Sequence, residues 1–553
     1  MRALGLAACA AVLFAALAGT ASAQGKRPLP ALAPAPADGL TRALEANRLT
    51  EAEYALQRAR SLFDLAKVRR SFGAVERPGL RDATAILRDL ALRQHELAGF
   101  DRTLARALLA RPDDGNVPYG LGTGWDPVPV PANVDHRCSD FGIRVCVHWV
   151  NLEEHPDAPD LTDDDENDVP DYIDEVIQTM DEIWLKLIGE IGYREPKDDS
   201  ESENPGIEGE LDIYIDDLDT FAFGYCTTDD PLLSDPDVYD LSAYCVLDND
   251  YASFGPLPPE DYLRVTAAHE FFHAVQYAYD AFEDGWLLEG TATNMETTVY
   301  PDIHDNLSFL GYSPLTRPAS PLDRYGFLDS EYGSWIFFRF LEEKVAGGDA
   351  GIVREIWERA DASAEAAYGD MYSLQAVRRA LSARGVGFPH AFAQFGQANR
   401  LRTYVDGALY PAPPFTRTWA LGGGRADTGW RSWRIDHLAT RHYSFRPAKG
   451  ASKNGKLRVR VRLPRADSRA TLIVVRPSGK TSTRYLTPNA KGVAGSTVWR
   501  FARGQVRRAH LVLTNGSTRT RCWEDGSGPP FFSCYGAPRD DRRVFELRAR
   551  FRR

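Results

Sequence analysis

Two histidines and a glutamate stand at a spacing that suits a metal ion, in the segment HEFFH at 269–273. On a helix, His269 and His273 project from one face, because residues four apart lie one above the other. Glu270 then lies about 100° around the helix and can act as a general base on a water held by that ion. A chain with eleven histidines contains this pattern by chance on the order of once in a hundred. The spacing therefore predicts a zinc site.

An ordinary packed helix is the alternative, since apolar and aromatic neighbours indicate that this helix is buried. Two buried histidines and a buried glutamate would be costly without a shared partner, which favours the metal. A catalytic zinc needs a third protein ligand and one open position. Glu289 is the candidate, because WLLEGTAT at 286–293 can return as a second helix beside the first. Asp280 lies too far along the first helix, and Glu283 and Asp284 fall in the connecting turn.

A second set of metal-type ligands lies in the segment LTDDDENDVPDYIDEV at 161–176. Residues 153–175 hold twelve acidic side chains and no lysine or arginine, so they would repel one another without a cation. The order of residue types follows that of a calcium-binding loop whose first position is Asp163. It departs from that loop at position six, which is Asp168 in place of glycine, and at position twelve, which is aspartate in place of glutamate. A solvated acidic loop is the alternative to a structural calcium. The predicted calcium ligands are Asp163, Asp165, Asn167, the Val169 carbonyl, Asp171 and Asp174.

The start of the chain has the form of a signal peptide. Within residues 1–23, Arg2 precedes an apolar run, and an A-x-A cleavage signal ends the segment. We identify no later stretch long enough for a membrane-spanning helix. Six cysteines remain, none with CxxC spacing, and nearest-neighbour pairing is expected in an oxidising compartment. The predicted disulfides are Cys138–Cys146, Cys226–Cys245 and Cys522–Cys534. These features predict a secreted protein, extracellular or periplasmic.

Three further parts are expected after the signal peptide. Residues 24–115 are a Pro- and Ala-rich leader and then a helical pattern, whose position fits a pro-region or an N-terminal cap. Residues 116–420 combine strand patterns with several helices, which predicts an α+β domain. We expect the strand at 242–250 to be the edge strand beside the cleft. Residues 430–553 read as short alternating strands, typical of an antiparallel β-sandwich.

Charge is distributed unevenly between these parts. Residues 1–430 contain 36 basic and 71 acidic residues, whereas 431–553 contain 29 basic and only 7 acidic ones. The basic C-terminal part is suited to contact anionic surfaces or the acidic catalytic part, or its arginines are solvated strand positions. It lacks a motif that interleaves basic and aromatic residues, so we expect no nucleic-acid partner.

The segments VTAAHEFFHAVQY and WLLEGTAT resemble the gluzincin metalloproteases, in which an HExxH helix is followed by a helix with a ligand glutamate. With NDVPDYIDEV and LDIYIDDL upstream, they resemble secreted bacterial metalloproteases of the myxobacterial type over roughly residues 120–420. The spacing to Glu289 is shorter than in the best-known gluzincins. The resemblance implies a zincin-like domain. It also implies that His269, His273 and Glu289 are the zinc ligands and that Glu270 is the general base.

Gluzincins often supply an oxyanion-stabilising tyrosine from a helix after the ligand glutamate. The resemblance thus points to Tyr332, with Tyr325 as the runner-up and ordinary packing as the alternative for both. The predicted function is a secreted zinc endopeptidase acting on proteins or peptides, with Glu270 moving a proton from the attacking water to the leaving amine. Two alternatives stay open. One is a calcium-stabilised binding or adhesion protein with a structural or inactive zinc site, and the other is a metal hydrolase acting on non-peptide amides.

Overall fold

The computed structural model describes residues 29–30, 32, 38–79, 81, 83–115, 124–125, 131–202, 204–207, 209–218, 222–235, 237–326, 330–424, 426–464, 467–523 and 531–553. The signal peptide predicted at 1–23 lies outside these residues. Within them, no helix is both long and apolar enough to cross a membrane.

The first described part of the chain is a group of packed helices. Local sequence accounts for their ends. At the start of α2, Thr50 accepts a hydrogen bond from the Glu53 backbone N–H (3.2 Å), and Glu53 accepts one from the Thr50 N–H (2.7 Å), which is a capping box. The helices are α1 (Gly39–Glu45), α2 (Glu51–Phe63), α3 (Leu65–Phe72), α4 (Ala83–Arg93) and α5 (Gly99–Leu108).

A mixed sheet follows, with strand order β1-β2-β3-β5-β4. The inner strands β2, β3 and β5 run parallel, and β1 and β4 lie antiparallel at the two edges. Parallel strands buried on both faces are largely apolar, and the segment VCVHWV in β2 is so except for His148, which contacts Asp212 of β3 (2.6 Å). The strands are β1 (Val134–Cys138), β2 (Val145–Val150), β3 (Leu211–Asp216), β4 (Gly224–Thr227) and β5 (Tyr244–Asp248).

The expectation that 242–250 forms the edge strand is wrong. That segment contains β5, which lies between β3 and β4, and β4 is the edge. The four residues of β4, GYCT, are too few to show an alternating pattern in the sequence. Cys226 of β4 faces Cys245 of β5 in register, and the two form a disulfide. The other two predicted pairs, Cys138–Cys146 and Cys522–Cys534, are also formed, so the predicted pairing is confirmed.

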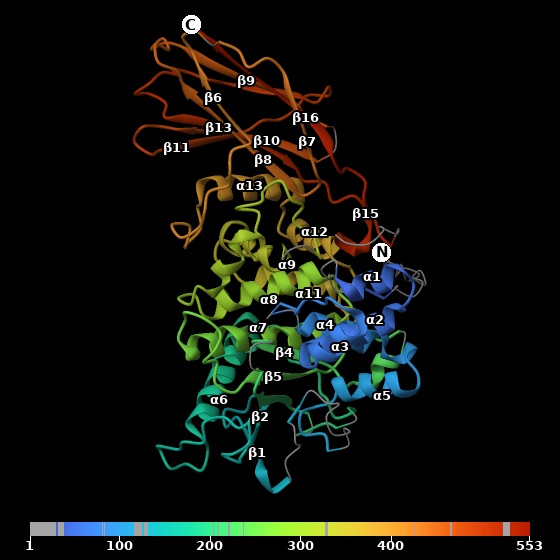
Figure 1. Cartoon of the computed structure of the whole chain (residues 1–553). Coiled ribbons are helices and arrows are strands. Elements are labelled where there is room, and N and C mark those ends of the chain that lie inside the picture. Colours follow the sequence, from blue (N-terminus) through green and yellow to red (C-terminus); the bar gives the residue numbers. More distant parts are fainter. Residues whose placement is uncertain are drawn as a thin grey trace, which may run out of the picture.

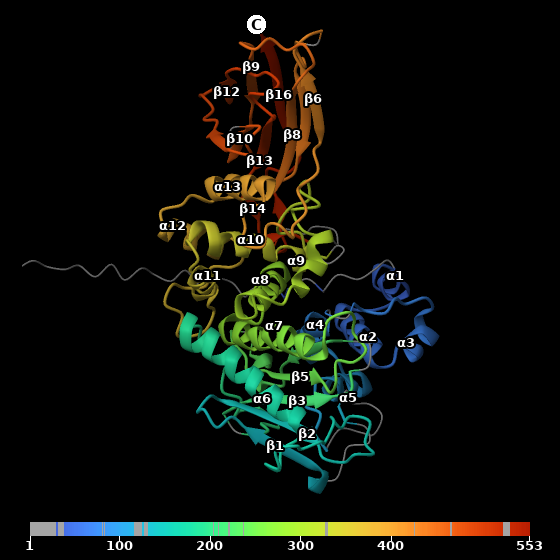
Figure 2. The same ribbon diagram turned by 90° about the vertical axis from the view of Figure 1, so that its left-hand side faces the viewer.

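Helices cover both faces of this sheet. On one face, α6 (Asp171–Trp184) and α7 (Pro259–Asp280) share a core with the strands, which includes Val147, Ile213 and Leu247. On the other face, Tyr244 and Val246 belong to a core that continues into the N-terminal helices. Figures 1 and 2 show α1–α5 grouped on one side of the molecule, next to α7 and the sheet.

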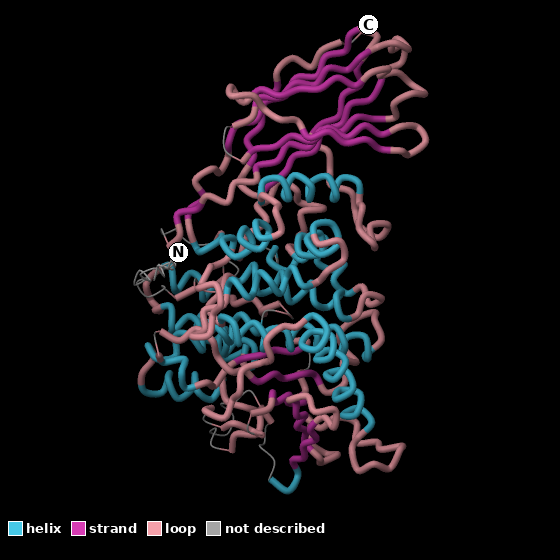
Figure 3. Tube along the Cα trace, turned by 180° about the vertical axis from the view of Figure 1, so that it is seen from behind, coloured by secondary structure: helices cyan, strands magenta, loops and turns pink. Residues whose placement is uncertain are grey.

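Further helices continue from α7 towards the C-terminal strands. Their aromatic residues form a dense cluster, in which Phe337 contacts the rings of Phe388, Phe392 and Phe395. Figure 3 shows these helices between the two strand-rich parts of the molecule. They are α8 (Gly285–Val299), α9 (Ser330–Gly333), α10 (Trp335–Phe340), α11 (Gly351–Ala360), α12 (Leu374–Ala383) and α13 (Phe388–Leu401).

The C-terminal part consists mostly of strands in two sheets that enclose their own core. In β9, Leu457, Val459 and Val461 point inwards, and the arginines between them are exposed. This alternation shows that many basic residues here are solvated strand positions. One sheet contains β6 (Arg417–Leu421), β8 (Ala439–Pro447), β10 (Ser468–Val475), β11 (Thr481–Tyr485) and β13 (Arg508–Asn515). The other contains β7 (Arg431–Ile435), β9 (Lys456–Arg462), β12 (Val493–Val498) and β16 (Arg543–Arg552). A short pair, β14 (Thr520–Arg521) and β15 (Ala537–Pro538), stands apart.

The chain is therefore of mixed α/β type, as predicted at the level of fold class, with several sheets and a strand-rich C-terminal part.

Candidate metal centre

Helices α7 and α8 position the three predicted zinc ligands. Pro259 opens α7, where its missing N–H costs nothing, and the helix continues to Asp280. His269 and His273 lie one turn apart on α7, with ring centroids 4.8 Å apart, and both are buried. The chain turns after Asp280 and returns as α8, which places Glu289 against them.

The ligand atoms of these three residues converge. The Glu289 Oε2 atom lies 3.4 Å from Nε2 of His269 and 3.6 Å from Nε2 of His273. All three ligand atoms lie within 4.8 Å of one another. The His273 Nε2 and Glu289 Oε2 atoms are buried, and among the described residues they have no hydrogen-bond partner. Buried polar atoms without a partner are rare, so this donor set fits a zinc ion shared between the three side chains.

Each histidine is held by a hydrogen bond from its other ring nitrogen. The Nδ1 atom of His269 donates to Glu296 Oε1 (2.8 Å), and Nδ1 of His273 donates to Gln276 Oε1 (2.7 Å). Gln276 is fixed in turn, because its Nε2 donates to the Leu288 carbonyl (2.9 Å) and to Thr291 Oγ1 (3.0 Å). These contacts turn both Nε2 atoms towards the shared site, as in known zinc centres.

The electrostatics of the trio suit a cation. Burial alone would lower the pKa of His269, but the neighbouring carboxylates of Glu289 and Glu296 raise that pKa to about 9, so a metal ion at this site would take the place of a proton on His269. Burial alone would raise the pKa of Glu289, but His273 and His269 lower it to about 2. The lowered pKa favours the ionised carboxylate of Glu289, which is the form that binds a metal.

Glu270 lies beside the trio and contacts the N-terminal helices. Its Oε2 accepts a hydrogen bond from the Thr84 hydroxyl of α4 (2.9 Å), and that hydroxyl accepts one from the Cys226 N–H of β4 (3.0 Å). Gly224 of β4 leaves room for the glutamate, because a Cβ there would lie 3.2 Å from the Glu270 Cγ. The predicted general base thus faces the sheet edge, and α4 lies over it.

Both predicted tyrosines lie next to the trio. The ring of Tyr332 stacks on His269 at 6.2 Å between centroids, and its hydroxyl donates to the Arg81 carbonyl. Tyr325 lines a cavity of about 10 Å³, together with His273 and Glu289. The structure therefore places both tyrosines beside the two histidines and Glu289.

The acidic residues rejected as third ligand are engaged elsewhere. Asp280 accepts a hydrogen bond from the Phe282 N–H (2.9 Å), and Glu283 accepts one from the Ser373 N–H (3.0 Å). Asp284 accepts one from the Cys534 N–H (2.7 Å). Among the described residues, Glu289 is the carboxylate that meets the two histidines.

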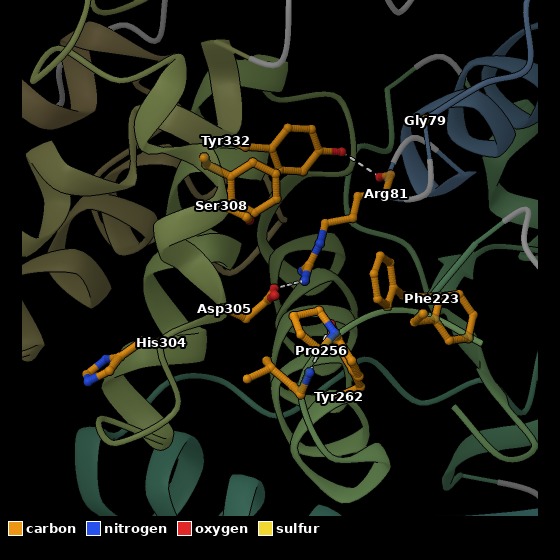
Figure 4. A pocket seen from close by; sticks show the side chains of 12 residues that line it. Gly79, Arg81, Phe223, Pro256, Tyr262, His304, Asp305, Ser308 and Tyr332 are labelled. Atoms are coloured by element: carbon orange, nitrogen blue, oxygen red, sulfur yellow. Dashed lines mark hydrogen bonds and ion pairs between the residues drawn. The ribbon is translucent and has the colours of Figure 1, made fainter. Parts of the chain in front are cut away.

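A larger cavity, of about 480 Å³, is lined by Arg81 and Tyr332 (Figure 4), and the Tyr332 ring stacks on His269 of the trio. Arg81 points into it, with its guanidinium paired to Glu296 (2.9 Å) and to Asp305. The guanidinium carbon lies 4.8 Å from the ring centroid of Phe223 and 5.2 Å from that of Phe309. This cavity was not predicted from the sequence. Of the two carboxylates that pair with Arg81, only Glu296 could have been recognised from local sequence, because it lies seven residues after Glu289 and therefore on the same face of the helix.

The predicted calcium loop brings together part of its ligand set. Carboxylate oxygens of Asp163, Asp165 and Asp171 lie within 4.8 Å of one another. The Asn167 side-chain amide donates to Asp165 (3.2 Å) and to Asp174 (2.9 Å). The N–H of Val169 donates to the Asn167 side-chain oxygen (2.8 Å), which closes the loop before α6. At the position where calcium loops carry glycine, Asp168 adopts φ of +67°, the left-handed conformation that glycine favours.

No protein-family model and no curated protein matches the chain. Among solved structures, it is similar to the pre-peptidase C-terminal domain of a collagenase from Bacillus anthracis. The identity is 10% and the TM-score 0.14, over 25% of this chain and 97% of that one. It is also similar to a 4-O-methyl-alpha-glucuronidase with specificity for decorated arabinogalactans. There the identity is 10% and the TM-score 0.13, over 56% of this chain and 46% of that one. Likenesses at these TM-scores carry no argument, so the site is judged by its own geometry.

Proposed function

We propose that the chain is a secreted zinc-dependent endopeptidase of the gluzincin type. The convergence of His269, His273 and Glu289 beside Glu270 carries this proposal. Two imidazole nitrogens and one carboxylate oxygen form a three-ligand set, which leaves the fourth position of a tetrahedral zinc open, as catalysis requires. A closed structural site would need a fourth protein ligand, and none is grouped with these three among the described residues.

The residues around the trio can carry out peptide hydrolysis. A zinc ion bound there would act as a Lewis acid towards a water and a substrate carbonyl. Glu270 takes a proton from the water as the water oxygen bonds to the carbonyl carbon, and it gives that proton to the nitrogen as the C–N bond breaks. Tyr332 donates a hydrogen bond to the carbonyl oxygen as negative charge develops on it. Its contact with the Arg81 main-chain carbonyl supports this role.

The surrounding fold supports a zincin-like catalytic domain. The edge strand β4 runs antiparallel to β5 beside Glu270, and a peptide in extended form can add to such an edge. The disulfides support export, because such bonds persist in oxidising compartments. The grouped oxygens of Asp163, Asp165 and Asp171 support a structural calcium ion between β2 and α6.

Zinc content and hydrolysis of casein test the proposal together. Thr84 contacts Glu270, so the segment that contains Arg81 and Thr84 covers the site. Zinc content and casein hydrolysis are therefore measured both on the intact chain and on Arg81→Ala, which loosens this segment. We expect one zinc per chain and hydrolysis by Arg81→Ala. Adding Glu270→Gln should keep the zinc and lower the rate by about 10²–10⁴-fold, the usual contribution of a general base.

One result would overturn the proposal. If all variants hold zinc and Arg81→Ala cleaves no faster than Arg81→Ala/Glu270→Gln, then the zinc is structural. The chain would then be a binding protein.

A further inference from the structure

Arg81 belongs to the N-terminal region, yet it contacts the groups that a peptide substrate would contact. Its main-chain carbonyl accepts the hydrogen bond of Tyr332. Its side chain enters the cavity beside the metal centre (Figure 4). A few residues later, Thr84 contacts both Glu270 and the N–H of Cys226 on the sheet edge. One segment therefore engages the predicted oxyanion donor, the predicted base and the strand edge.

The cavity that holds the Arg81 side chain is built for a cation. Two carboxylates, Glu296 and Asp305, pair with the guanidinium, and their side chains are 1% and 12% exposed. The rings of Phe223 and Phe309 lie within cation–π distance. Burial would lower the pKa of Arg81, but the two carboxylates outweigh burial and hold that pKa above its usual value.

Asp305 has no part in the proposed metal centre. Glu296 positions His269, whereas the only partner shown for Asp305 among the described residues is Arg81. A buried cluster of two carboxylates and two aromatic rings would be unfavourable without a cation. If Arg81 leaves when a substrate enters, another cation must take its place.

The arrangement described here excludes a peptide from the metal centre. The cavity shared by His273, Glu289 and Thr84 measures about 10 Å³, which is room for one water-sized occupant. A substrate can therefore reach Glu270 only after the segment around Arg81 and Thr84 moves away.

We infer that the pocket of Asp305, Phe223 and Phe309 is the subsite for an arginine or lysine side chain of a peptide substrate, which Arg81 occupies until it is displaced. The inference rests on the proposed peptidase function. Arg81 places its main-chain carbonyl against the Tyr332 hydroxyl and its side chain in the pocket. Cleavage is therefore expected on the carboxyl side of the basic residue.

Binding of a small guanidinium tests the pocket without any need for catalysis. Ethylguanidinium is titrated by calorimetry into the zinc-loaded full-length protein. Arg81→Ala should bind it in roughly the millimolar range, whereas the unaltered chain should not, because Arg81 fills the site. Adding Asp305→Asn to Arg81→Ala should weaken binding by about 10-fold or more. The matched control is Arg93→Ala, which removes a buried arginine of α4 whose guanidinium pairs with Glu51 (3.4 Å) and Asp89 (3.8 Å), away from this pocket and from the metal centre.

Cleavage of a peptide library tests the substrate class. Arg81→Ala should cleave after arginine or lysine with a kcat/KM on the order of 10–100-fold above that for leucine, and Arg81→Ala/Asp305→Asn should lose that ratio. If Arg81→Ala cleaves without preference for basic residues, the inference is wrong and the peptidase proposal stands. If Arg81→Ala binds ethylguanidinium but no zinc-loaded variant cleaves, the peptidase proposal fails and the cation pocket stands.

Two further outcomes decide the remaining cases. If folded Arg81→Ala neither binds ethylguanidinium nor prefers basic peptides, the inference is overturned. If Arg81→Ala does not fold, the same binding and cleavage measurements are made on Arg81→Gln. The glutamine amide fills part of the cavity but leaves both carboxylates without a cation.

Discussion

Replacing Gln276 with leucine isolates one contact of the metal centre. The Gln276 Oε1 atom accepts the hydrogen bond from His273 Nδ1 (2.7 Å), and its amide nitrogen is bound on the other side by the Leu288 carbonyl and by Thr291. Leucine has a similar volume and no polar atom, so the His273 ring loses the contact that orients it. Residues in this position typically contribute 10–100-fold to metal affinity, so zinc should bind about 10–100-fold more weakly. The difference corresponds to about 1.4–2.7 kcal/mol of binding free energy.

The same substitution has a separate cost in the metal-free protein. It leaves a buried N–H of His273 without a partner, which lowers the free energy of unfolding by about 1–3 kcal/mol. Zinc affinity is measured by competition with a chelator of known affinity, and stability by denaturant unfolding in excess chelator. The matched control is Gln375→Leu, the same chemical change at an exposed position of α12. An unchanged zinc affinity in folded Gln276→Leu would refute the assignment of His273 as a ligand oriented by this contact.

Three further predictions concern the calcium loop and the hydrogen bonds of His437, in the strand-rich C-terminal part, with Asp323 and Asp541. Asp168→Gly relieves a left-handed backbone conformation and should raise the free energy of unfolding by about 1 kcal/mol, measured by denaturant titration; a decrease would contradict this reasoning. Chelation of calcium should lower the unfolding temperature of the chain but not that of Asp163→Asn, and an equal response would argue against a calcium ion at this loop. Burial lowers the pKa of His437, but Asp323 (2.9 Å) and Asp541 (3.0 Å) outweigh it and raise the pKa to about 9. The stabilisation is therefore complete below about pH 6.5 and lost as the pH rises through about 9. Unfolding of His437→Gln at pH 6 and pH 10 should show a smaller pH dependence than that of the unaltered chain, and an equal dependence would refute the assignment.

Local periodicity accounts for what the sequence could predict at the site. The i, i+4 spacing of His269 and His273 and the short return to Glu289 depend on two consecutive helices, which adjoin in space because they adjoin in the chain. Gln276 lies three residues after His273, and Glu296 lies seven residues after Glu289. Helical geometry would therefore have placed both on the faces that bear the ligands. Neither was identified, because a glutamine and a glutamate on a helix are common without any such role.

The contacts of the N-terminal region could not be predicted in this way. Thr84 and Glu270 are 186 residues apart, and nothing in the sequence around either indicates the other. Arg81 lies 224 residues from Asp305, and its pairing depends on how a group of helices docks on the sheet. The edge strand β4 was missed for a different reason. Its position follows from pairing with β5, and four residues carry too little pattern to be recognised.

The way the N-terminal region is held indicates how the site can open. Its helices share a core with Tyr244 and Val246 of the sheet, so release of the whole region would expose an apolar face. Its far end is anchored where buried Arg111 pairs with Asp199 (2.7 Å), Asp229 (2.9 Å) and Asp212. By contrast, the bonds shown over the site are polar ones made by Arg81 and Thr84, and a substrate with a basic side chain and a main-chain carbonyl can replace those of Arg81. These differences favour local displacement of the segment around Arg81 and Thr84, with the remaining helices kept as a permanent layer on the sheet.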